Sequence, residues 1–336
     1  MVFIHERGVR FPLGPPKKMY NIGIIQPIHQ EGIKILEKNE KFNVEIIDDI
    51  SIDNLKKKIS KYDGISIRTA NLTSEILSKA INLKIISRHG VGFDNIDLKT
   101  AKNQNITITI TTNANAVAVA EHVMFMILNI AKRKNMYDDN VRKGEFSLRN
   151  KLPKTIELWN KKMLIIGFGR IGQCLIKRCK AFEMQVFVYD PFVTDETITQ
   201  HGGIKINNII DNIGDMNFIS LHLPLNNKTK NLFNYEMICK LRKDCILINA
   251  ARGGIVNEDD LNRSLNENKI FGAGLDVFEK EPPNKDSPLL KNKKVFLSPH
   301  TAAFTEECMI RMAKETTQNI VDFFDNKLDK SKIVKL

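Results

Sequence analysis

The pattern of apolar and polar residues along this chain predicts short strands that alternate with amphipathic helices. From Tyr20 onward, runs rich in β-branched residues are followed by segments with apolar residues at helical spacing. In the first third of the chain the expected strands are 22–25, 44–47, 65–67, 83–87 and 106–110, and the expected helices lie near 29–38, 52–60, 73–81 and 96–104. Alternation of this kind is typical of a parallel, doubly wound sheet.

The pattern changes after residue 115 and then resumes. Residues 116–131 are apolar enough to predict a long helix, whereas 135–160 are polar with little periodicity. A second alternating series predicts six strands, at 163–166, 186–189, 218–221, 246–249, 272–277 and 295–298. The segment 306–325 has helical periodicity and is expected to return to cover the first domain. We therefore predict an α/β fold with two doubly wound parallel-sheet domains, the second inserted into the first.

The length of 336 residues supports two domains, at roughly 150 residues per domain. The first domain is expected to be discontinuous and to comprise 19–114 and 301–336, and the second to comprise 115–300. Residues 1–18 lack the apolar core of a secretory signal and contain three prolines, so they are expected to form a disordered extension. A short basic tail follows the last predicted helix, and we expect no regulatory domain there.

The net charge of +12 raises the question of a nucleic-acid partner. The lysines that produce it are spread along the chain, without interleaved aromatic residues and without a recognisable nucleic-acid-binding motif. We therefore predict no specific nucleic-acid partner. The positive surface is instead expected to attract small anionic substrates.

The longest apolar stretch and the five cysteines indicate which cellular compartment to expect. The most apolar stretch, 114–131, is interrupted by Glu121 and His122, so no membrane span is expected. The five cysteines form no C-x-x-C pair, which argues against a metal site and favours a reducing compartment. We therefore expect a cytoplasmic protein without a bound metal, whose cysteines are small buried hydrophobic residues.

A glycine-rich turn in the second domain predicts a dinucleotide site. Residues 167–172 read G-x-G-x-x-G, directly after the apolar run 163–166 and at the start of an amphipathic helix. Gly167 permits a tight turn, Gly169 lets the backbone approach a pyrophosphate, and Gly172 allows close packing of helix and strand. The diphosphate would then lie on the N-terminus of the helix.

Asp190 indicates which dinucleotide is bound. It ends the next predicted strand, eighteen residues past Gly172, where an acidic residue accepts hydrogen bonds from the adenosine ribose. A carboxylate at this position would repel a 2′-phosphate, and Pro191 and Phe192 follow it in place of an arginine. We therefore predict NAD rather than NADP as the cofactor.

Three polar residues follow predicted strand ends in the same domain: Arg252, Glu281 and His300. When hydride reaches a carbonyl carbon, negative charge grows on the oxygen, and a histidine has a suitable pKa to supply the proton. Glu281 would orient His300 and raise its pKa, and Arg252 would grip a carboxylate or carbonyl through its fork of donors. Their joint placement beside the glycine motif predicts a hydride-transfer site.

A second glycine-rich turn lies in the first domain, at Gly90, Val91 and Gly92. Successive backbone N–H groups in such a turn form an anion nest, which would suit a substrate carboxylate. The remaining histidines near predicted site segments are interpreted as packing or supporting residues rather than as catalytic ones: His89, His122 and His222.

Five segments together make the chain similar to a known family. They are 89–97 (HGVGFDNID), the glycine motif, 249–254 (NAARGG), 275–283 (LDVFEKEPP) and 298–300 (SPH). On these motifs the chain resembles the D-isomer-specific 2-hydroxyacid dehydrogenases, particularly the branch of phosphoglycerate dehydrogenases and hydroxypyruvate/glyoxylate reductases. The resemblance implies a Rossmann NAD-binding domain inserted into a flavodoxin-like substrate domain.

The resemblance also implies roles for particular residues. Arg252 and the Glu281–His300 pair would be the catalytic groups, and Arg68 would lie near the substrate. Asp276 would contact the nicotinamide carboxamide. Further cofactor contacts are implied at Arg170, Ile171, Leu223 and Ala250. The family also implies a homodimer joined through the cofactor domains, in keeping with the long apolar stretch 116–131.

The sequence therefore predicts an NAD-dependent oxidoreductase that interconverts a small D-2-hydroxy acid and its 2-oxo acid. Its favoured substrate is 3-phosphoglycerate or a related glycerate- or glyoxylate-type compound. Two alternatives stay open. One is a non-catalytic NAD-sensing interaction protein, because the family includes corepressors; the other is formate oxidation, for which glutamine would be expected in place of Glu281.

Overall fold

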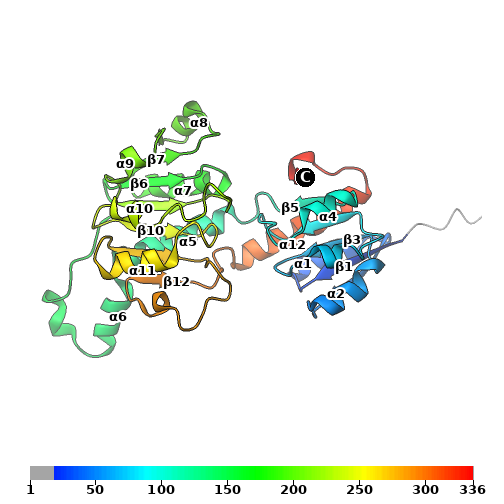
Figure 1. Cartoon of the computed structure of the whole chain (residues 1–336), viewed down its shortest axis with the longest axis horizontal. Coiled ribbons are helices and arrows are strands. Elements are labelled where there is room, and N and C mark those ends of the chain that lie inside the picture. Colours follow the sequence, from blue (N-terminus) through cyan, green and yellow to red (C-terminus); the bar gives the residue numbers. More distant parts are fainter. Residues whose placement is uncertain (1–18, 336) are drawn as a thin grey trace, which may run out of the picture. The chain divides into compact units, whose positions relative to one another are not determined.

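The computed structural model describes residues 19–335 as two compact units, each built around one parallel sheet (Figure 1). The first unit combines the described residues up to Thr112 with those from Met309 onward, and the second is Asn113–Cys308. The predicted domain limits after residues 114 and 300 stay predictions. The extension predicted at 1–18 lies outside the described residues.

Within residues 19–335, the sheet of the first unit has five parallel strands in the order β2-β1-β3-β4-β5. The strands are β1 (Tyr20–Ile25), β2 (Phe42–Ile47), β3 (Gly64–Ile67), β4 (Ile85–Arg88) and β5 (Thr107–Ile110). This is the strand order of flavodoxin-like folds, so the predicted architecture of the first domain is confirmed.

Helices cover both faces of this sheet. One face packs against α2 (Ile52–Lys58), η1 (Ile59–Lys61), α3 (Ser74–Leu77) and α4 (Leu98–Asn103). The other packs against α1 (Gln30–Glu37) and α12 (Glu306–Phe324), where Ala313 and Ile320 contact the cluster that contains Ile22 and Ile24. The last helix therefore returns to the first unit, as predicted, and η4 (Lys330–Lys332) follows it.

In the described part of the chain, the second sheet has seven parallel strands in the order β12-β11-β10-β9-β6-β7-β8. They are β6 (Lys162–Ile166), β7 (Gln185–Tyr189), β8 (Ile204–Lys205), β9 (Phe218–Leu221), β10 (Ile246–Asn249), β11 (Gly272–Leu275) and β12 (Val295–Leu297). The order reverses between β6 and β9, as in a Rossmann fold. The prediction of six strands was wrong, because the two residues of β8 are too few to show alternation.

Alternate residues of the strands in this sheet, β8 excepted, enter two separate cores. Met163 and Ile165 of β6 face a cluster formed with α5 (Ala116–Ala131), α7 (Arg170–Ala181) and α8 (Asp195–Gln200). Leu164 and Ile166 face the opposite cluster, formed with α9 (Ile210–Ile213), α10 (Tyr235–Cys239) and α11 (Glu258–Asn266). Burial on both faces explains why these strands are continuous apolar runs.

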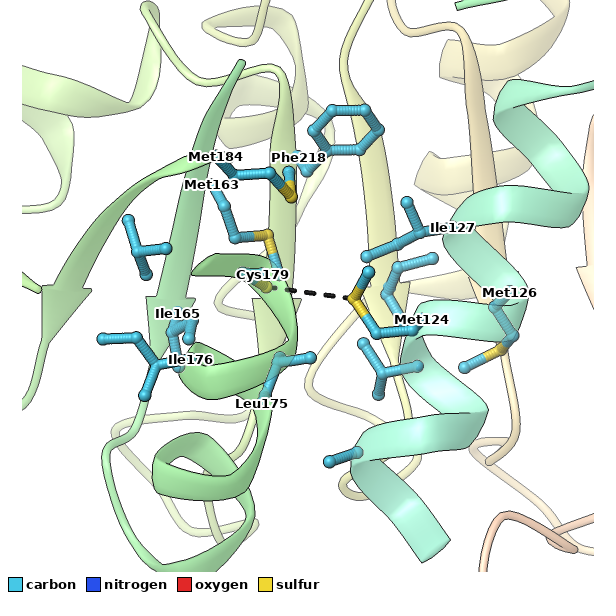
Figure 2. Close-up of a cluster of buried hydrophobic side chains, with 14 of the residues drawn as sticks. Met124, Met126, Ile127, Met163, Ile165, Leu175, Ile176, Cys179, Met184 and Phe218 are labelled. Carbon is cyan, nitrogen blue, oxygen red and sulfur yellow. Dashed lines mark hydrogen bonds between the residues drawn. The ribbon is translucent and has the colours of Figure 1, made fainter. Parts of the chain in front are cut away.

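The core between α5 and α7 is rich in sulfur (Figure 2). Met124 of α5 points toward Cys179 of α7, with 3.9 Å between the two sulfur atoms. Three cysteines are buried, but Cys239 is exposed and Cys174 is half-buried, so the prediction that all five are buried was wrong. Cys239 is the last residue of the short helix α10, whose buried residue is the preceding Ile238.

The predicted irregular stretch 135–160 contains two helical segments, α6 (Lys134–Arg142) and η2 (Phe146–Asn150). No residue of α6 is buried. An exposed helix does not need apolar residues at helical spacing, so the pattern of the sequence did not reveal it. A further short segment, η3 (Pro288–Lys291), precedes β12.

Among the helices of residues 19–335, none combines the length and the apolar composition that a bilayer crossing requires.

Candidate active site

The predicted site residues of the second unit gather at the carboxyl edge of its sheet. The turns that follow consecutive strand ends supply, in sheet order, His300 after β12, Asp276 after β11, Arg252 after β10, Leu223 after β9, Gly167 after β6 and Asp190 after β7. This edge includes the reversal of strand order between β6 and β9, which is where open parallel sheets bind ligands.

Two glycines of the 167–172 turn are required by close backbone contacts. Gly167 has φ +96°, and a Cβ atom there would lie 2.3 Å from the His222 carbonyl oxygen. A Cβ at Gly172 would lie 2.5 Å from the Gly167 carbonyl oxygen. Side chains at these two positions would therefore disrupt the turn itself.

Gly169 differs from both, because no described atom lies within 4 Å of the position its Cβ would occupy. It is the N-cap of α7, and as a glycine it has no side chain to cap the first N–H groups of the helix. Arg170 and Ile171 begin the helix, so their backbone N–H groups belong to the first turn, which has no acceptor within the helix. Open space beside such donors fits a dinucleotide pyrophosphate.

Asp190 secures the same turn through its carboxylate. One oxygen accepts the Phe168 N–H at 2.8 Å, and the other accepts the Phe192 N–H at 2.8 Å. The carboxylate therefore places a negative charge beside the glycine turn, where a ribose hydroxyl would meet an acceptor and a 2′-phosphate would meet repulsion. Nearby, Leu223 packs against Gly167, and the buried Ala250 follows β10.

The turn that carries Arg252 is folded by Asn249. The buried Asn249 amide donates to the Arg252 carbonyl oxygen at 2.9 Å, and its oxygen accepts the Ala251 N–H at 3.1 Å. A Cβ at Gly253 would lie 1.7 Å from the Phe278 carbonyl oxygen. Glycine at this position lets the arginine turn pack directly on the loop that leads to Glu281.

Glu281 and His300 form a direct pair. Glu281 Oε2 lies 2.7 Å from His300 Nδ1, and Oε1 accepts the Phe278 N–H at 3.1 Å. The hydrogen bond to Glu281 raises the pKa of His300, against the effect of burial. Burial alone would raise the pKa of Glu281, but His300, the Phe278 N–H and the charge of Arg252 together hold that pKa below its usual value.

In this pair, His300 can carry a proton that is available for transfer to a substrate. His300 is about half exposed, and Glu281 occupies its Nδ1, so Nε2 is the ring nitrogen available to a substrate. The raised pKa keeps the imidazolium populated to higher pH than in a free histidine. Arg252 adds a fixed positive charge that is felt by both members of the pair.

Asp276 holds the turn that presents His300. Its backbone oxygen accepts the His300 N–H at 2.8 Å, and its carboxylate accepts the N–H groups of Thr301 and Ala302 at 2.8 and 2.9 Å. The Ser298 hydroxyl donates to the same carboxylate at 2.6 Å. Sequence reasoning assigned Asp276 only a cofactor contact and missed this structural role, since no pattern in the sequence links residue 276 to residues 298–302.

The three histidines to which the sequence analysis gave packing or supporting roles lie in different surroundings. His122 Nε2 lies 2.9 Å from Ser298 Oγ, and His222 Nε2 lies 2.9 Å from Ser220 Oγ. Burial lowers the pKa of His222 to about 4. Burial, with the charges of Arg68 and Arg88, lowers the pKa of His89 to about 3.

The predicted substrate residues of the first unit lie at the carboxyl edge of its own sheet. Arg68 follows β3, and Gly90 follows β4, which pairs with β3. Burial lowers the pKa of Arg68, which donates to the Pro27 carbonyl oxygen at 3.0 Å. Gly90 has φ +142°, and the half-buried Val91 comes next. The positive φ explains why glycine occupies position 90.

Comparison with known proteins defines the class of this fold and site. Residues 124–302 match the family described as D-isomer specific 2-hydroxyacid dehydrogenase, NAD binding domain. The chain is 38% identical over 290 residues to the D-3-phosphoglycerate dehydrogenase of Methanocaldococcus jannaschii, a match that covers 86% of this chain and 54% of that protein. It is 34% identical to the hydroxypyruvate reductase of Thermotoga maritima, over 90% of this chain and 97% of that protein.

A solved structure gives the same result. The NAD⁺-bound 3-phosphoglycerate dehydrogenase of Entamoeba histolytica superposes with a TM-score of 0.79 at 28% identity, covering 95% of this chain and 99% of that one. This chain therefore belongs to the D-isomer specific 2-hydroxyacid dehydrogenase family, and the resemblance inferred from its motifs is confirmed. It spans about half the length of the first curated D-3-phosphoglycerate dehydrogenases that it matches.

Proposed function

We propose that this chain is an NAD-dependent oxidoreductase that interconverts a small D-2-hydroxy acid and the corresponding 2-oxo acid. The observation that carries this proposal is the 2.7 Å contact between Glu281 Oε2 and His300 Nδ1, with the charge of Arg252 acting on both residues. A lone histidine after a strand would not support it. A histidine paired with a carboxylate, on the sheet edge that also carries the glycine turn, has the composition of a carbonyl acid–base site.

The residues around the glycine turn fit a nicotinamide dinucleotide. Gly169 leaves open space before the N-terminus of α7, and Asp190 places an acceptor beside it. We propose NAD as the preferred form, because the Asp190 carboxylate would repel a 2′-phosphate. When bound, the nicotinamide supplies or accepts the hydride.

The proton step falls to His300. In reduction, its Nε2–H would donate to the carbonyl oxygen as negative charge develops there, and in oxidation the neutral ring would take the proton back. Glu281 keeps the ring oriented and stabilises the charged form. Arg252 would hold the substrate carboxylate or carbonyl oxygen, since a guanidinium presents paired donors to such groups.

For the substrate we propose 3-phosphoglycerate or a related glycerate- or glyoxylate-type acid. The relatives named above carry the names D-3-phosphoglycerate dehydrogenase and hydroxypyruvate reductase. In the first unit, the turn at Gly90 and Val91 has successive N–H groups that would suit a substrate carboxylate, and we propose Arg68 as a further substrate contact.

The experiment that tests the proposal is NADH oxidation by the purified chain with 3-phosphohydroxypyruvate, hydroxypyruvate and glyoxylate. We expect turnover with at least one of the three, abolished in His300→Ala. An absence of NADH oxidation with all three, in a protein that binds NADH, would reject the proposed function and favour a non-catalytic NAD-sensing protein.

We also propose that the chain forms a homodimer. Val117 and Phe125 of α5 are exposed, and so is Phe146 in η2. Large apolar side chains exposed on one long helix are typical of a surface that another protein covers. Light scattering at micromolar concentration is expected to give about twice the chain mass of 38.4 kDa.

A further inference from the structure

His122 lies on α5, outside the set of residues that the proposed function uses, yet it contacts the turn that carries His300. Its Nε2 lies 2.9 Å from Ser298 Oγ and 3.7 Å from Asp276 Oδ1. We infer that His122 is a positioning residue, whose Nε2–H fixes Ser298 and Asp276 in the arrangement that presents His300 for proton transfer. This inference rests on the proposed function.

The direction of each hydrogen bond follows from the number of protons available. The Ser298 hydroxyl has one proton, which it donates to Asp276 Oδ1 at 2.6 Å. Its oxygen must therefore accept at the contact with His122, so the proton of that contact lies on Nε2. Burial lowers the pKa of His122, although Asp276 opposes this effect, and the neutral ring carries only one N–H. The geometry therefore selects the Nε2–H tautomer.

The turn that this chain of hydrogen bonds supports has an unfavourable backbone. His300 has φ +53°, in the left-handed region that disfavours residues with a Cβ. Such a conformation persists when surrounding contacts impose it. Here the contacts come from Asp276, which binds the backbone N–H groups of His300, Thr301 and Ala302.

Asp276 itself is held from the other side. It is 1% exposed, and the short hydrogen bond from Ser298 Oγ fixes the rotation of its carboxylate. His122 binds the oxygen of the same hydroxyl, and a hydroxyl held at both its proton and its oxygen has less freedom to rotate away from Asp276. The expected consequence of losing the His122 N–H is a looser turn and a His300 ring that meets Glu281 less often.

His122 also lines a cavity, which leaves one side of its ring without packing neighbours. A cavity of about 440 Å³ is lined by α5 residues and by the segment just past His300: Ala118, Glu121, His122, Phe125, Thr301, Ala302, Phe304 and Thr305. His122 therefore stands between an open cavity and the turn, with its side chain 17% exposed. Neighbouring packing does not substitute for the hydrogen bond, because one side of the ring faces this space.

A matched pair of variants separates the N–H from the bulk of the ring. In His122→Gln, the amide nitrogen lies at nearly the position of Nε2 and donates, whereas His122→Met has similar length and no donor. We expect His122→Met to lower kcat for carbonyl reduction by about 10- to 100-fold, as a misplaced catalytic group does. We expect His122→Gln to stay within about threefold of the wild type. The affinity for NADH should change far less than kcat in both, because the glycine turn and Asp190, which would hold the diphosphate and the ribose, are intact.

A second variant covers the case in which His122→Met fails to fold. Ser298→Ala removes the same link from its other end and should lower kcat to a similar extent. In the double variant the two losses should not add, because both remove one chain of hydrogen bonds. Additive losses, or a His122→Gln enzyme as impaired as His122→Met, would overturn the inference.

A readout independent of turnover keeps this inference distinct from the proposed function. The pKa of His300, followed by NMR of the cofactor-free protein, should fall in His122→Met and stay at its wild-type value in His122→Gln. If the wild type oxidises no NADH but the pKa of His300 shifts in this way, the proposed function fails and the positioning role of His122 stands. If the wild type is active, and His122→Met turns over equally fast with the pKa of His300 unmoved, the inference fails and the function stands.

Discussion

Two turns at the carboxyl edge of the second sheet reach unusual backbone conformations by opposite means. At the glycine turn, Gly167 has φ +96° and lies so close to the His222 carbonyl that no side chain fits. At the turn that carries His300, the proposed general acid (the catalytic turn), a histidine with a full side chain has φ +53°. Asp276 holds it there with hydrogen bonds from another strand end. The first conformation is permitted by the residue type, and the second is imposed by the surroundings.

The difference has consequences for function. The glycine turn needs only backbone, so its residues can be small, and the dinucleotide proposed above would be met by N–H groups. The general acid proposed at position 300 is an imidazole, so glycine cannot be used there. The left-handed backbone conformation of His300 costs free energy. The hydrogen bonds that the buried Asp276 accepts from the turn offset this cost. The two turns should accordingly fail in different ways when they are altered.

The largest effect is expected at the catalytic turn. His300→Ala should lower kcat for reduction by on the order of 10²- to 10⁴-fold, because the general acid is removed. NADH affinity should hardly change, since Gly169 and Asp190 are untouched. Steady-state kinetics and fluorescence titration of NADH measure the two quantities. Near-normal turnover in this variant would mean that the proton comes from another group.

The next effect distinguishes two glycines within the other turn. Gly167→Ala should destabilise the fold by about 2 kcal/mol or more, because the added Cβ meets a carbonyl oxygen at a strained φ. Gly169→Ala should leave the melting temperature nearly unchanged, because no described atom lies within 4 Å of the new Cβ. Its NADH dissociation constant should rise by about tenfold, equivalent to about 1.4 kcal/mol. Equal melting temperatures for the two variants would contradict the contrast.

A smaller effect is expected at Asp190. Asp190→Ala should lower the preference for NAD over NADP by about 10- to 100-fold, because a charge-assisted hydrogen bond and a repulsive charge are lost together. Some stability should be lost as well, since the carboxylate accepts the N–H groups of Phe168 and Phe192. The ratio of kcat/KM for the two cofactors tests this. A wild type that uses both equally well would already exclude NAD preference.

The smallest expected change is a shift in pH dependence. The hydrogen bond that His300 donates to Glu281 raises the pKa of His300, so the acid form needed for carbonyl reduction persists to higher pH and is lost as the pH rises through that pKa. In Glu281→Gln the pKa should fall, and the alkaline limb of the kcat/KM profile for reduction should move to lower pH. Oxidation, which needs the neutral ring, should conversely extend to lower pH. An unshifted limb would remove Glu281 from this role.

Much of the architecture could be predicted before the structure, and the exceptions have physical causes. The central strands of both sheets are buried on two faces and therefore appear as apolar runs, but β8 has only two residues and shows no pattern. The helix α6 has no buried residue, so nothing required an apolar stripe in its sequence. The glycine turn was predictable because its sterics are local, and Glu281 and His300 were predictable because each follows a strand end. The contacts of Asp276 with residues 298–302 were not predictable, because no pattern in the sequence links these positions.

The amino-acid sequence by itself determined the two parallel-sheet units, the glycine turn and the group of candidate residues Arg252, Glu281 and His300. These features depend on periodicity or on local backbone sterics, which neighbouring residues carry. Only the tertiary structure decided that Asp276 holds the catalytic turn and that His122 reaches Ser298 across 176 positions of sequence. A hydrogen bond between distant segments leaves no local pattern, because its partners meet only after the sheet and α5 have packed together.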